Sequence, residues 1–162
     1  KVVKEKKTAE MLVLCGLPGS GKSTIAEILE QRGYIRVNQD VLGSRNACVR
    51  LAEASLDANK SVMIDRCNFD VNQRKTWVDL AKKHGIDNVR CLYMEVDADR
   101  CLQRAIERVG HPTIKDQESA ERAIGFMVQK FVAPTLSEGF IEIIPANTGW
   151  PSEIADLVRD KQ

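Results

Sequence analysis

The stretch GLPGSGKST (residues 16–24) limits the possible folds of this chain more than any other feature of its sequence. It matches the phosphate-binding pattern G-x-x-x-x-G-K-[ST] at every position, and it lies between the apolar run MLVLC and a segment with helical spacing. Glycines let backbone N–H groups converge on phosphate oxygens, and the positive end of the following helix adds to the attraction. The stretch therefore predicts a nucleoside triphosphate site, with a structural glycine turn as the alternative.

Two side chains of this loop have predicted roles in such a site. Lys22 would reach the β- and γ-phosphates, and Ser23 would bind Mg²⁺. The loop does not indicate whether the phosphate is transferred to water, to a small molecule or to a macromolecule. The predicted nucleotide-binding residues of the loop are Gly16, Leu17, Pro18, Gly19, Ser20, Gly21, Lys22, Ser23 and Thr24.

Short apolar runs alternate with segments of helical spacing along the whole chain. The runs that predict strands are residues 11–15, 34–37, 61–65, 89–96 and 140–144. The predicted helices cover residues 21–32, 44–59, 72–84, 97–109 and 118–132, and one more follows Pro151. This alternation predicts an α/β fold of the P-loop NTPase type, with a five-stranded parallel sheet between two layers of helices. Residues 1–10 are expected to form a flexible lead before a single domain, residues 11–162.

The composition narrows the class of protein. Hydrophobic residues make up 43% and charged residues 29% of the chain, as in globular domains. A net charge of +1 and 5% aromatic residues argue against a surface built mainly on basic or base-stacking side chains. No apolar run approaches the roughly 18 residues of a membrane span, and we expect an intracellular protein without a membrane partner. The five cysteines, without C-x-x-C spacing, are expected to be buried free thiols.

Polar residues follow two of the predicted strands. Asp40 comes three residues after the strand that ends at Val37, and Asp65 ends the next strand. Parallel strands bring their carboxyl ends to one edge, where ligands bind. Asp40 could accept the proton of an attacking hydroxyl or could cap a helix, and the pattern leaves both readings open. Asp65 could hold Mg²⁺, directly or through water, or be a turn acid, and Asn68 could orient phosphate or acceptor or belong to the loop.

Arginines indicate a possible lid. Arg100, Arg104 and Arg108 recur at four-residue spacing and share one face of the predicted helix 97–109, while Leu102, Ala105, Ile106 and Val109 are expected to face inward. Like charges at this spacing repel by roughly 0.2–0.5 kcal/mol per pair, and a triphosphate would relieve the repulsion. We interpret the helix as part of an arginine-bearing lid, with a solvated face as the alternative.

Candidate contacts to an acceptor are Arg45, Arg50, Arg66 and Arg74, with Lys75 as a further candidate.

Four segments together resemble one family of kinases. The phosphate loop, GYIRVNQDVLGS (residues 33–44), IDRCNFD (residues 64–70) and APTLSEGF (residues 133–140) are similar to the polynucleotide 5′-hydroxyl kinases. The likeness is greatest to the kinase module of the eukaryotic polynucleotide kinase/phosphatase, and it covers nearly all of residues 11–144. The resemblance implies a P-loop kinase domain that transfers the γ-phosphate of ATP, or of another nucleoside triphosphate, to the 5′-OH end of DNA or RNA with Mg²⁺. It also implies a nuclear or cytoplasmic role in DNA or RNA repair, beside a fused or tethered repair domain.

The resemblance assigns roles to individual residues. The general base falls on Asp40, and the Asp and Asn that the family places after its third strand fall on Asp65 and Asn68. With the arginine candidates named above, the expected acceptor-side residues are Asp40, Arg45, Arg66, Asn68 and Arg74. Mg²⁺ would be held by Ser23 and, through water, by Asp65. The expected catalytic residues are Lys22, Asp40, Arg104 and Arg108, of which Arg104 and Arg108 also contact the nucleotide.

The sequence departs from the family at two positions. Gln39 stands where many relatives carry arginine, and Gly43 stands where some place an acceptor-side arginine, which Arg45 or Arg50 could replace. The departures therefore concern the residues expected to contact the acceptor. A kinase of a small metabolite or nucleoside on the same scaffold is the alternative function, and a nucleotide-gated binding module is a third.

Overall fold

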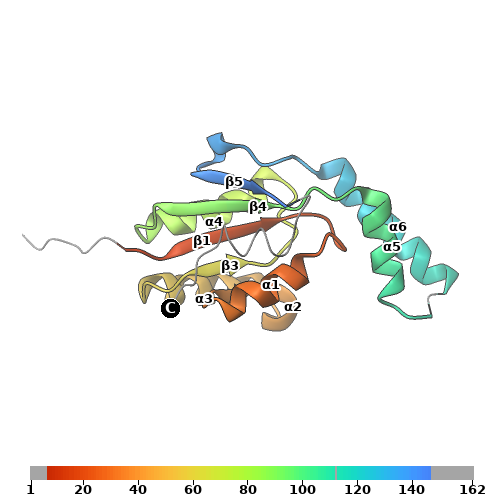
Figure 1. The fold of residues 1–162 in the computed structure, drawn as a ribbon, viewed down its shortest axis with the longest axis horizontal. Helices are drawn as coiled ribbons and strands as arrows, with labels where there is room; N and C mark the ends of the chain where they lie inside the picture. The colour runs from red at the N-terminus through yellow and green to blue at the C-terminus, as the bar shows by residue number, and fades with distance from the viewer. Residues whose placement is uncertain (1–6, 112, 147–162) are drawn as a thin grey trace, which may run out of the picture.

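The computed structural model describes residues 7–111 and 113–146. Five parallel strands in this part of the chain form one sheet in the order β2-β3-β1-β4-β5, which confirms the predicted fold class (Figure 1). The strands are β1 (Glu10–Cys15), β2 (Ile35–Val37), β3 (Val62–Ile64), β4 (Asn88–Tyr93) and β5 (Glu142–Pro145). The helices are α1 (Lys22–Gln31), α2 (Gln39–Leu42), α3 (Arg45–Asp57), α4 (Val71–Lys83), α5 (Ala98–Glu107) and α6 (Ile114–Lys130), followed by the 3₁₀ turn η1 (Leu136–Glu138).

Helices cover both faces of the sheet because side chains of a strand alternate between the faces. Leu12 and Leu14 of β1 pack on one face, in a core shared with Ile25, Ala26 and Leu29 of α1. The other face carries Met11, Val13 and Cys15, in a core shared with Ala52 and Leu56 of α3 and Trp77 and Val78 of α4. All six residues of β1 are buried. The central strand is therefore packed on both sides, and the phosphate loop extends from its end.

The strand order places β3 between β2 and β1. Val37 of β2 pairs with Ile64 of β3, and Ile64 in turn pairs with Val13 of β1. The chain crosses from one side of β1 to the other between β3 and β4, and ligands of open α/β sheets bind at such a change of direction. The end of β3, with Asp65, therefore lies between the phosphate loop and the segment that carries Asp40.

Several predicted boundaries differ from the observed ones for local reasons. The helix expected at residue 118 begins at Ile114, because Thr113 and Asp116 form a capping box. The helix α5 ends at Glu107, and Val109, expected to face inward, is 54% exposed. Ala9 and Glu10 are buried, and β1 begins at Glu10, within the range that was expected to be a flexible lead. Residues 1–6 and the helix expected after Pro151 lie outside the described residues.

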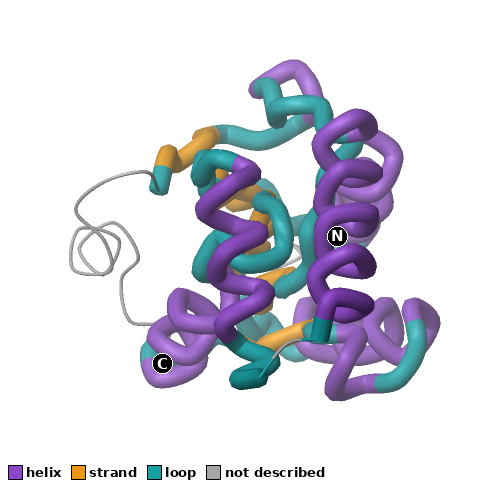
Figure 2. The backbone as a smooth tube through the Cα atoms, turned by 90° about the vertical axis from the view of Figure 1, so that its right-hand side faces the viewer, coloured by secondary structure: helices purple, strands orange, loops and turns teal. Residues whose placement is uncertain are grey.

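The helices α5 and α6 form a hairpin beyond the carboxyl ends of the strands (Figure 1). Figure 2 faces this end of the molecule and shows helices in front of the strand ends. Cys101 of α5 and Ile124 of α6 pack against Leu17 of the phosphate loop. Gly19 of the loop has a φ of +81°, and a Cβ there would collide with the backbone carbonyl of Cys101. The hairpin therefore touches the loop closely, where the sequence predicted a lid.

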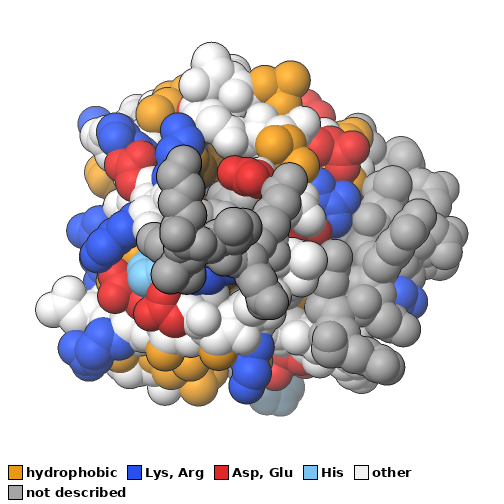
Figure 3. Space-filling view, turned by 90° about the vertical axis from the view of Figure 1, so that its left-hand side faces the viewer, with side chains coloured by type: hydrophobic (Ala, Val, Ile, Leu, Met, Phe, Trp, Pro, Cys, Tyr) orange, Lys and Arg blue, Asp and Glu red, His pale blue; other side chains and the backbone are white. Residues whose placement is uncertain are grey.

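The opposite face, at the amino ends of the strands, carries charges of both signs on its described part (Figure 3). Asp57 pairs with Lys7 at 3.8 Å and with His84 at 2.6 Å, and Lys83 pairs with Glu53 at 3.6 Å. Such interspersed charges do not create the one-signed field that attracts a polyanion. Of the helices in the described ranges, none combines the length and apolar character needed to cross a bilayer.

Candidate active site

The phosphate loop connects β1 directly to α1. Gly19 and Gly21 have φ of +81° and +101°, values that glycine adopts without strain. The Nζ of Lys22 donates to the carbonyls of Gly16 at 2.9 Å and Leu17 at 2.7 Å, so its side chain curls back over the loop. Ser23 is exposed in the first turn of α1. The loop thus has positive φ at two of its glycines, and the Lys22 ammonium lies over the loop, where its contact with a nucleotide stays a prediction.

Asp65 lies beside this loop, at the end of β3, and is almost fully buried. Its Oδ2 accepts hydrogen bonds from Nε of Arg36 at 2.9 Å and Nδ2 of Asn38 at 2.7 Å, and it pairs with Nη2 of Arg36 at 2.7 Å. Burial alone would lower the pKa of Arg36, but its bonds to Asp65 and Glu30 outweigh burial and raise that pKa. Arg36 therefore stays charged, and the buried carboxylate has a fixed partner.

Asp40 is exposed in the first turn of the short helix α2. The side chain of Asn38 caps this helix, because its Oδ1 accepts from the backbone N–H groups of Asp40 at 2.8 Å and Val41 at 3.3 Å. Ser44 caps the next helix, α3. The sequence reading in which Asp40 itself serves as a cap is therefore wrong, since asparagine and serine hold both cap positions.

Two adjoining pockets meet at Asp40. The loop-side pocket has a volume of about 230 Å³, and the α6-side pocket one of about 330 Å³. Both are lined by Asn38, Asp40, Asp65, Arg66 and Cys67. The loop-side pocket is further lined by Pro18, Gly19, Lys22, Ser23 and Arg108, and the α6-side pocket by Gln39, Phe69, Gln73 and Met127. Asp40 thus lines both the space beside the phosphate loop and a second space of mixed polarity.

The hairpin contributes two of the expected arginines. The Nη1 of Arg104 donates to the carbonyl of Gly19 at 3.2 Å, and Arg108 lines the loop-side pocket. Arg100 is exposed on the same helix and is not among the lining residues of this pocket. Arg104 and Arg108, four residues apart, are therefore both beside the phosphate loop, and the structure gives no such contact for Arg100.

A third pocket lies along α4. This α4-side pocket, of about 210 Å³, shares Arg66 and Gln73 with the α6-side pocket. Arg45 also lines it, and its Nη2 donates to Oγ1 of Thr76 at 2.8 Å. The remaining lining residues are Asp70, Asn72, Thr76 and Trp77. Of the arginines expected on the acceptor side, Arg66 lines pockets together with Asp40, and Arg45 lines the next pocket, which shares Arg66 and Gln73.

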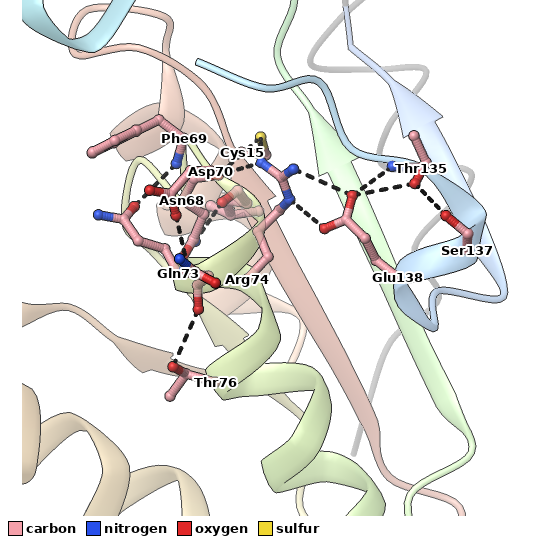
Figure 4. Close-up of polar contacts among 12 residues, drawn as sticks. Cys15, Asn68, Phe69, Asp70, Gln73, Arg74, Thr76, Thr135, Ser137 and Glu138 are labelled. Atoms are coloured by element: carbon pink, nitrogen blue, oxygen red, sulfur yellow. Dashed lines mark hydrogen bonds and ion pairs between the residues drawn. The ribbon is translucent and has the colours of Figure 1, made fainter. Parts of the chain in front are cut away.

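Arg74 was expected on the acceptor surface, and that expectation is wrong. Its side chain is fully buried and binds Glu138 through Nε at 2.7 Å and Nη2 at 3.2 Å (Figure 4). Its Nη1 donates to the carbonyl of Asn68 at 2.8 Å. Arg74 shares the inward face of α4 with Trp77, Val78 and Ala81, so helical geometry directs it into the core. It joins α4, η1 and the loop after β3.

Asn68 does not face the pockets either, which contradicts the role expected for it. It is 1% exposed, and its Nδ2 donates to the carbonyls of Leu14 at 2.7 Å and Arg66 at 3.3 Å. Its φ of +48° lies in the left-handed region that asparagine tolerates. Asn68 therefore shapes the turn after β3, next to the bond that joins Gly16 N to the carbonyl of Cys67 at 3.0 Å.

Some residues of the site were not expected from the sequence. Arg36 and Asn38 hold Asp65, and Phe69 and Met127 form the apolar lining of the α6-side pocket. Asn38 had a recognisable signal, since asparagine directly before a short helix is a preferred cap. Cys67 is half-buried beside Asp40, whereas the other four cysteines are buried as expected.

Comparisons with known proteins give the family and the relatives of this chain. A family model described as an AAA domain matches residues 11–134. The chain is 35% identical over 141 residues to the bifunctional polynucleotide phosphatase/kinase of Schizosaccharomyces pombe, covering 86% of this chain and 34% of that protein. It is 34% identical over 137 residues to a putative bifunctional polynucleotide phosphatase/kinase of Acanthamoeba polyphaga mimivirus, covering 83% of this chain and 32% of that protein.

Solved structures share the fold at low sequence identity. A fungal RNA kinase superposes with a TM-score of 0.63 at 18% identity, over 91% of this chain and 78% of that one. A gluconokinase from Sinorhizobium meliloti superposes with a TM-score of 0.62 at 16% identity, over 94% of this chain and 90% of that one. The chain spans about a third of the length of the two phosphatase/kinases. It belongs to the AAA domain family, and its sequence resemblance to the polynucleotide phosphatase/kinases is confirmed.

Proposed function

We propose that this chain is a polynucleotide 5′-hydroxyl kinase that transfers the γ-phosphate of ATP, or of another nucleoside triphosphate, to the 5′-OH end of DNA or RNA. The observation that carries the proposal is that Asp40 lines both the loop-side and the α6-side pocket. A group that accepts a proton during phosphate transfer must reach the attacking hydroxyl while that hydroxyl is next to the γ-phosphate, and a residue that lines both pockets is placed for this role. The similarity to the two phosphatase/kinases supports a nucleic-acid acceptor.

In the proposed reaction the 5′ oxygen of the acceptor forms a bond to the γ-phosphorus while the bond from that phosphorus to the β–γ bridging oxygen breaks. The carboxylate of Asp40 accepts the hydroxyl proton, and the nucleoside diphosphate leaves. Lys22 and the loop N–H groups bind the phosphates, while Arg104 and Arg108 approach from the hairpin and balance charge on the transferred group.

Ser23 and Asp65 fit the Mg²⁺ that this chemistry uses. Both line the loop-side pocket, and both offer oxygen atoms, the ligands that Mg²⁺ prefers. The described ranges contain no cluster of three or more His, Cys, Asp or Glu side chains that could hold a metal alone. Such a site suits an ion that is held by Ser23 directly and by Asp65 through water, and that otherwise binds phosphate oxygens. When bound, Mg²⁺ supplies charge compensation for those phosphates.

The acceptor strand is proposed to run from Asp40 through the α6-side pocket into the α4-side pocket. Arg66 lines all three pockets, and Arg45 lines the last of them. A nucleic acid held by few phosphates near its 5′ end suits a chain with a net charge of +1 better than a long basic groove would. In this proposal the chain acts in nucleic-acid repair in the nucleus or cytoplasm.

A transfer assay tests the proposal directly. Labelled ATP, GTP, CTP and UTP are each incubated with Mg²⁺ and with a 5′-hydroxyl DNA oligonucleotide, a 5′-hydroxyl RNA oligonucleotide or a metabolite panel that includes gluconate and shikimate. Label on the 5′ end of an oligonucleotide, but not on the same oligonucleotide with a 5′-phosphate, supports the proposal. A labelled metabolite with unlabelled oligonucleotides would favour the small-molecule kinase, and tight ATP binding without any transfer would favour a binding module.

Arg45→Ala and Arg66→Ala are expected to weaken acceptor binding. Each should raise the KM for a single-stranded oligonucleotide, and Arg45→Ala should leave the KM for ATP within about twofold, because Arg45 lines the α4-side pocket and not the loop-side pocket. Loss of one phosphate contact should also reduce the slope of log affinity against log salt by about 0.7. Lys83→Ala is the matched control, because this lysine ends α4 on the opposite face of the molecule, at the amino ends of the strands. An unchanged salt slope in both arginine variants would remove them from the acceptor path.

A further inference from the structure

Asn38 directly follows β2 and makes hydrogen bonds at both aspartates of the site, to the backbone of Asp40 and to the side chain of Asp65. Its Oδ1 accepts from the N–H groups of Asp40 at 2.8 Å and Val41 at 3.3 Å, and its Nδ2 donates to Oδ2 of Asp65 at 2.7 Å. The orientation of the amide is determined by these partners, because donors lie on one side of it and a carboxylate on the other. One side chain thus ties the first turn of α2 to the end of β3.

The Asp65 end of this link is rigid. The side chain of Asp65 is 4% exposed, and Arg36 holds its Oδ2 from β2 at 2.9 and 2.7 Å. Nη1 of Arg36 also pairs with Oε1 of Glu30 on α1 at 3.2 Å. Asp65 is therefore fixed to three neighbouring elements, namely α1, β2 and β3.

The Asp40 end of the link has little support from packing. The helix α2 has four residues, none of them buried, and Val41 is 79% exposed. Leu42 makes a partly buried apolar contact at the far end of the helix. A segment with so few buried contacts opens easily, so the placement of Asp40 depends on the cap at its first turn.

We infer that Asn38 is a positioning residue for phosphate transfer: it holds the carboxylate of Asp40 at the junction of the two pockets by tying α2 to the buried Asp65. The inference rests on the proposed role of Asp40 as proton acceptor. The Asn38 amide provides both halves of the link, because its oxygen accepts from the helix N–H groups while its nitrogen donates to the carboxylate. Serine would keep the cap but lose the link to Asp65, because its hydroxyl is too short to span both partners.

The test is a kinetic cycle with Asn38→Ser and Asp40→Asn, measured with saturating ATP and a 5′-hydroxyl oligonucleotide. Asn38→Ser is expected to lower kcat on the order of 10- to 100-fold, the size of effect that a small misplacement of a reacting group produces. The KM for ATP should stay within about twofold. In the Asp40→Asn background, Asn38→Ser should have almost no further effect, because a residue that acts through Asp40 has nothing left to position.

Ser44→Ala is the matched control. It removes the cap of α3, where Oγ of Ser44 accepts from Ala47 N at 3.1 Å, but breaks no bond to Asp65. It should lower the melting temperature, because a helix cap is lost, and leave kcat unchanged. Wild-type kcat in Asn38→Ser, or losses that multiply in the double variant, would overturn the inference while the proposed function stands. Wild-type transfer by Asp40→Asn would overturn both, since Asn38 would then have no base to position.

Discussion

Asp40→Asn is expected to lower the rate of phosphate transfer on the order of 10²–10⁴-fold, the usual contribution of a general base. Asparagine has nearly the size of aspartate but cannot accept the proton of the attacking hydroxyl. The fold should survive, because the Asp40 side chain is exposed and the cap of α2 comes from Asn38. Nucleotide binding should also survive, because Lys22 and the loop backbone remain. Single-turnover transfer and calorimetric ATP titration measure the two effects separately.

Asp79→Asn is the matched control for this variant. It makes the same chemical change on α4, where Asp79 is exposed and pairs with Lys75 at 2.6 Å. We expect it to transfer phosphate at the wild-type rate. Near-normal transfer by Asp40→Asn, with ATP binding intact, would show that another group accepts the proton.

Arg74→Met is expected to lower the free energy of unfolding by about 3–5 kcal/mol, the usual cost of removing one partner of a buried ion pair. The guanidinium is fully buried and binds Glu138, whose side chain is 7% exposed (Figure 4). It also donates a hydrogen bond to the carbonyl of Asn68. Without it the Glu138 carboxylate stays buried without its cation, and the Asn68 carbonyl loses a donor. Urea denaturation followed by circular dichroism measures the change.

Lys75→Met, one position along the same helix, is the control for this stability effect. The ammonium of Lys75 is exposed and pairs with Asp79 four residues away, so its loss should cost less than about 1 kcal/mol. The double variant Arg74→Met/Glu138→Leu should be more stable than Arg74→Met alone, because no uncompensated charge remains. Equal losses for Arg74→Met and Lys75→Met would contradict the assignment of Arg74 to the core.

The sequence predicted the fold and the position of the site because both depend on local patterns. The loop of residues 16–24 has a fixed consensus, and Asp40 and Asp65 follow apolar runs, so their shared edge follows from a parallel sheet. The order of strands was not predictable in this way. The pairing of Ile35 with Val62 is a contact between distant segments, and it puts Asp65 between the loop and Asp40.

The wrong expectations concern side chains whose partners are far away in the sequence. Arg74 was assigned to the surface because arginine is rarely buried without a partner, and its partner Glu138 is 64 residues away. Arg74 lies three and seven residues before Trp77 and Ala81, on the buried face of α4, and this spacing was a local sign of burial. The prediction instead followed the usual exposure of arginine. The role predicted for Asn68 was wrong for a similar reason, because its amide donates to the carbonyl of Leu14, 54 residues earlier.

The most direct test of the central claim is a crystal structure with Mg²⁺, a non-hydrolysable ATP analogue and a short 5′-hydroxyl oligonucleotide. We expect the γ-phosphate in the loop-side pocket, the terminal nucleoside in the α6-side pocket, and a carboxylate oxygen of Asp40 within about 2.6–3.2 Å of the 5′ oxygen. An oligonucleotide bound away from the α6-side pocket, or an Asp40 carboxylate turned away from the 5′ oxygen, would contradict the account.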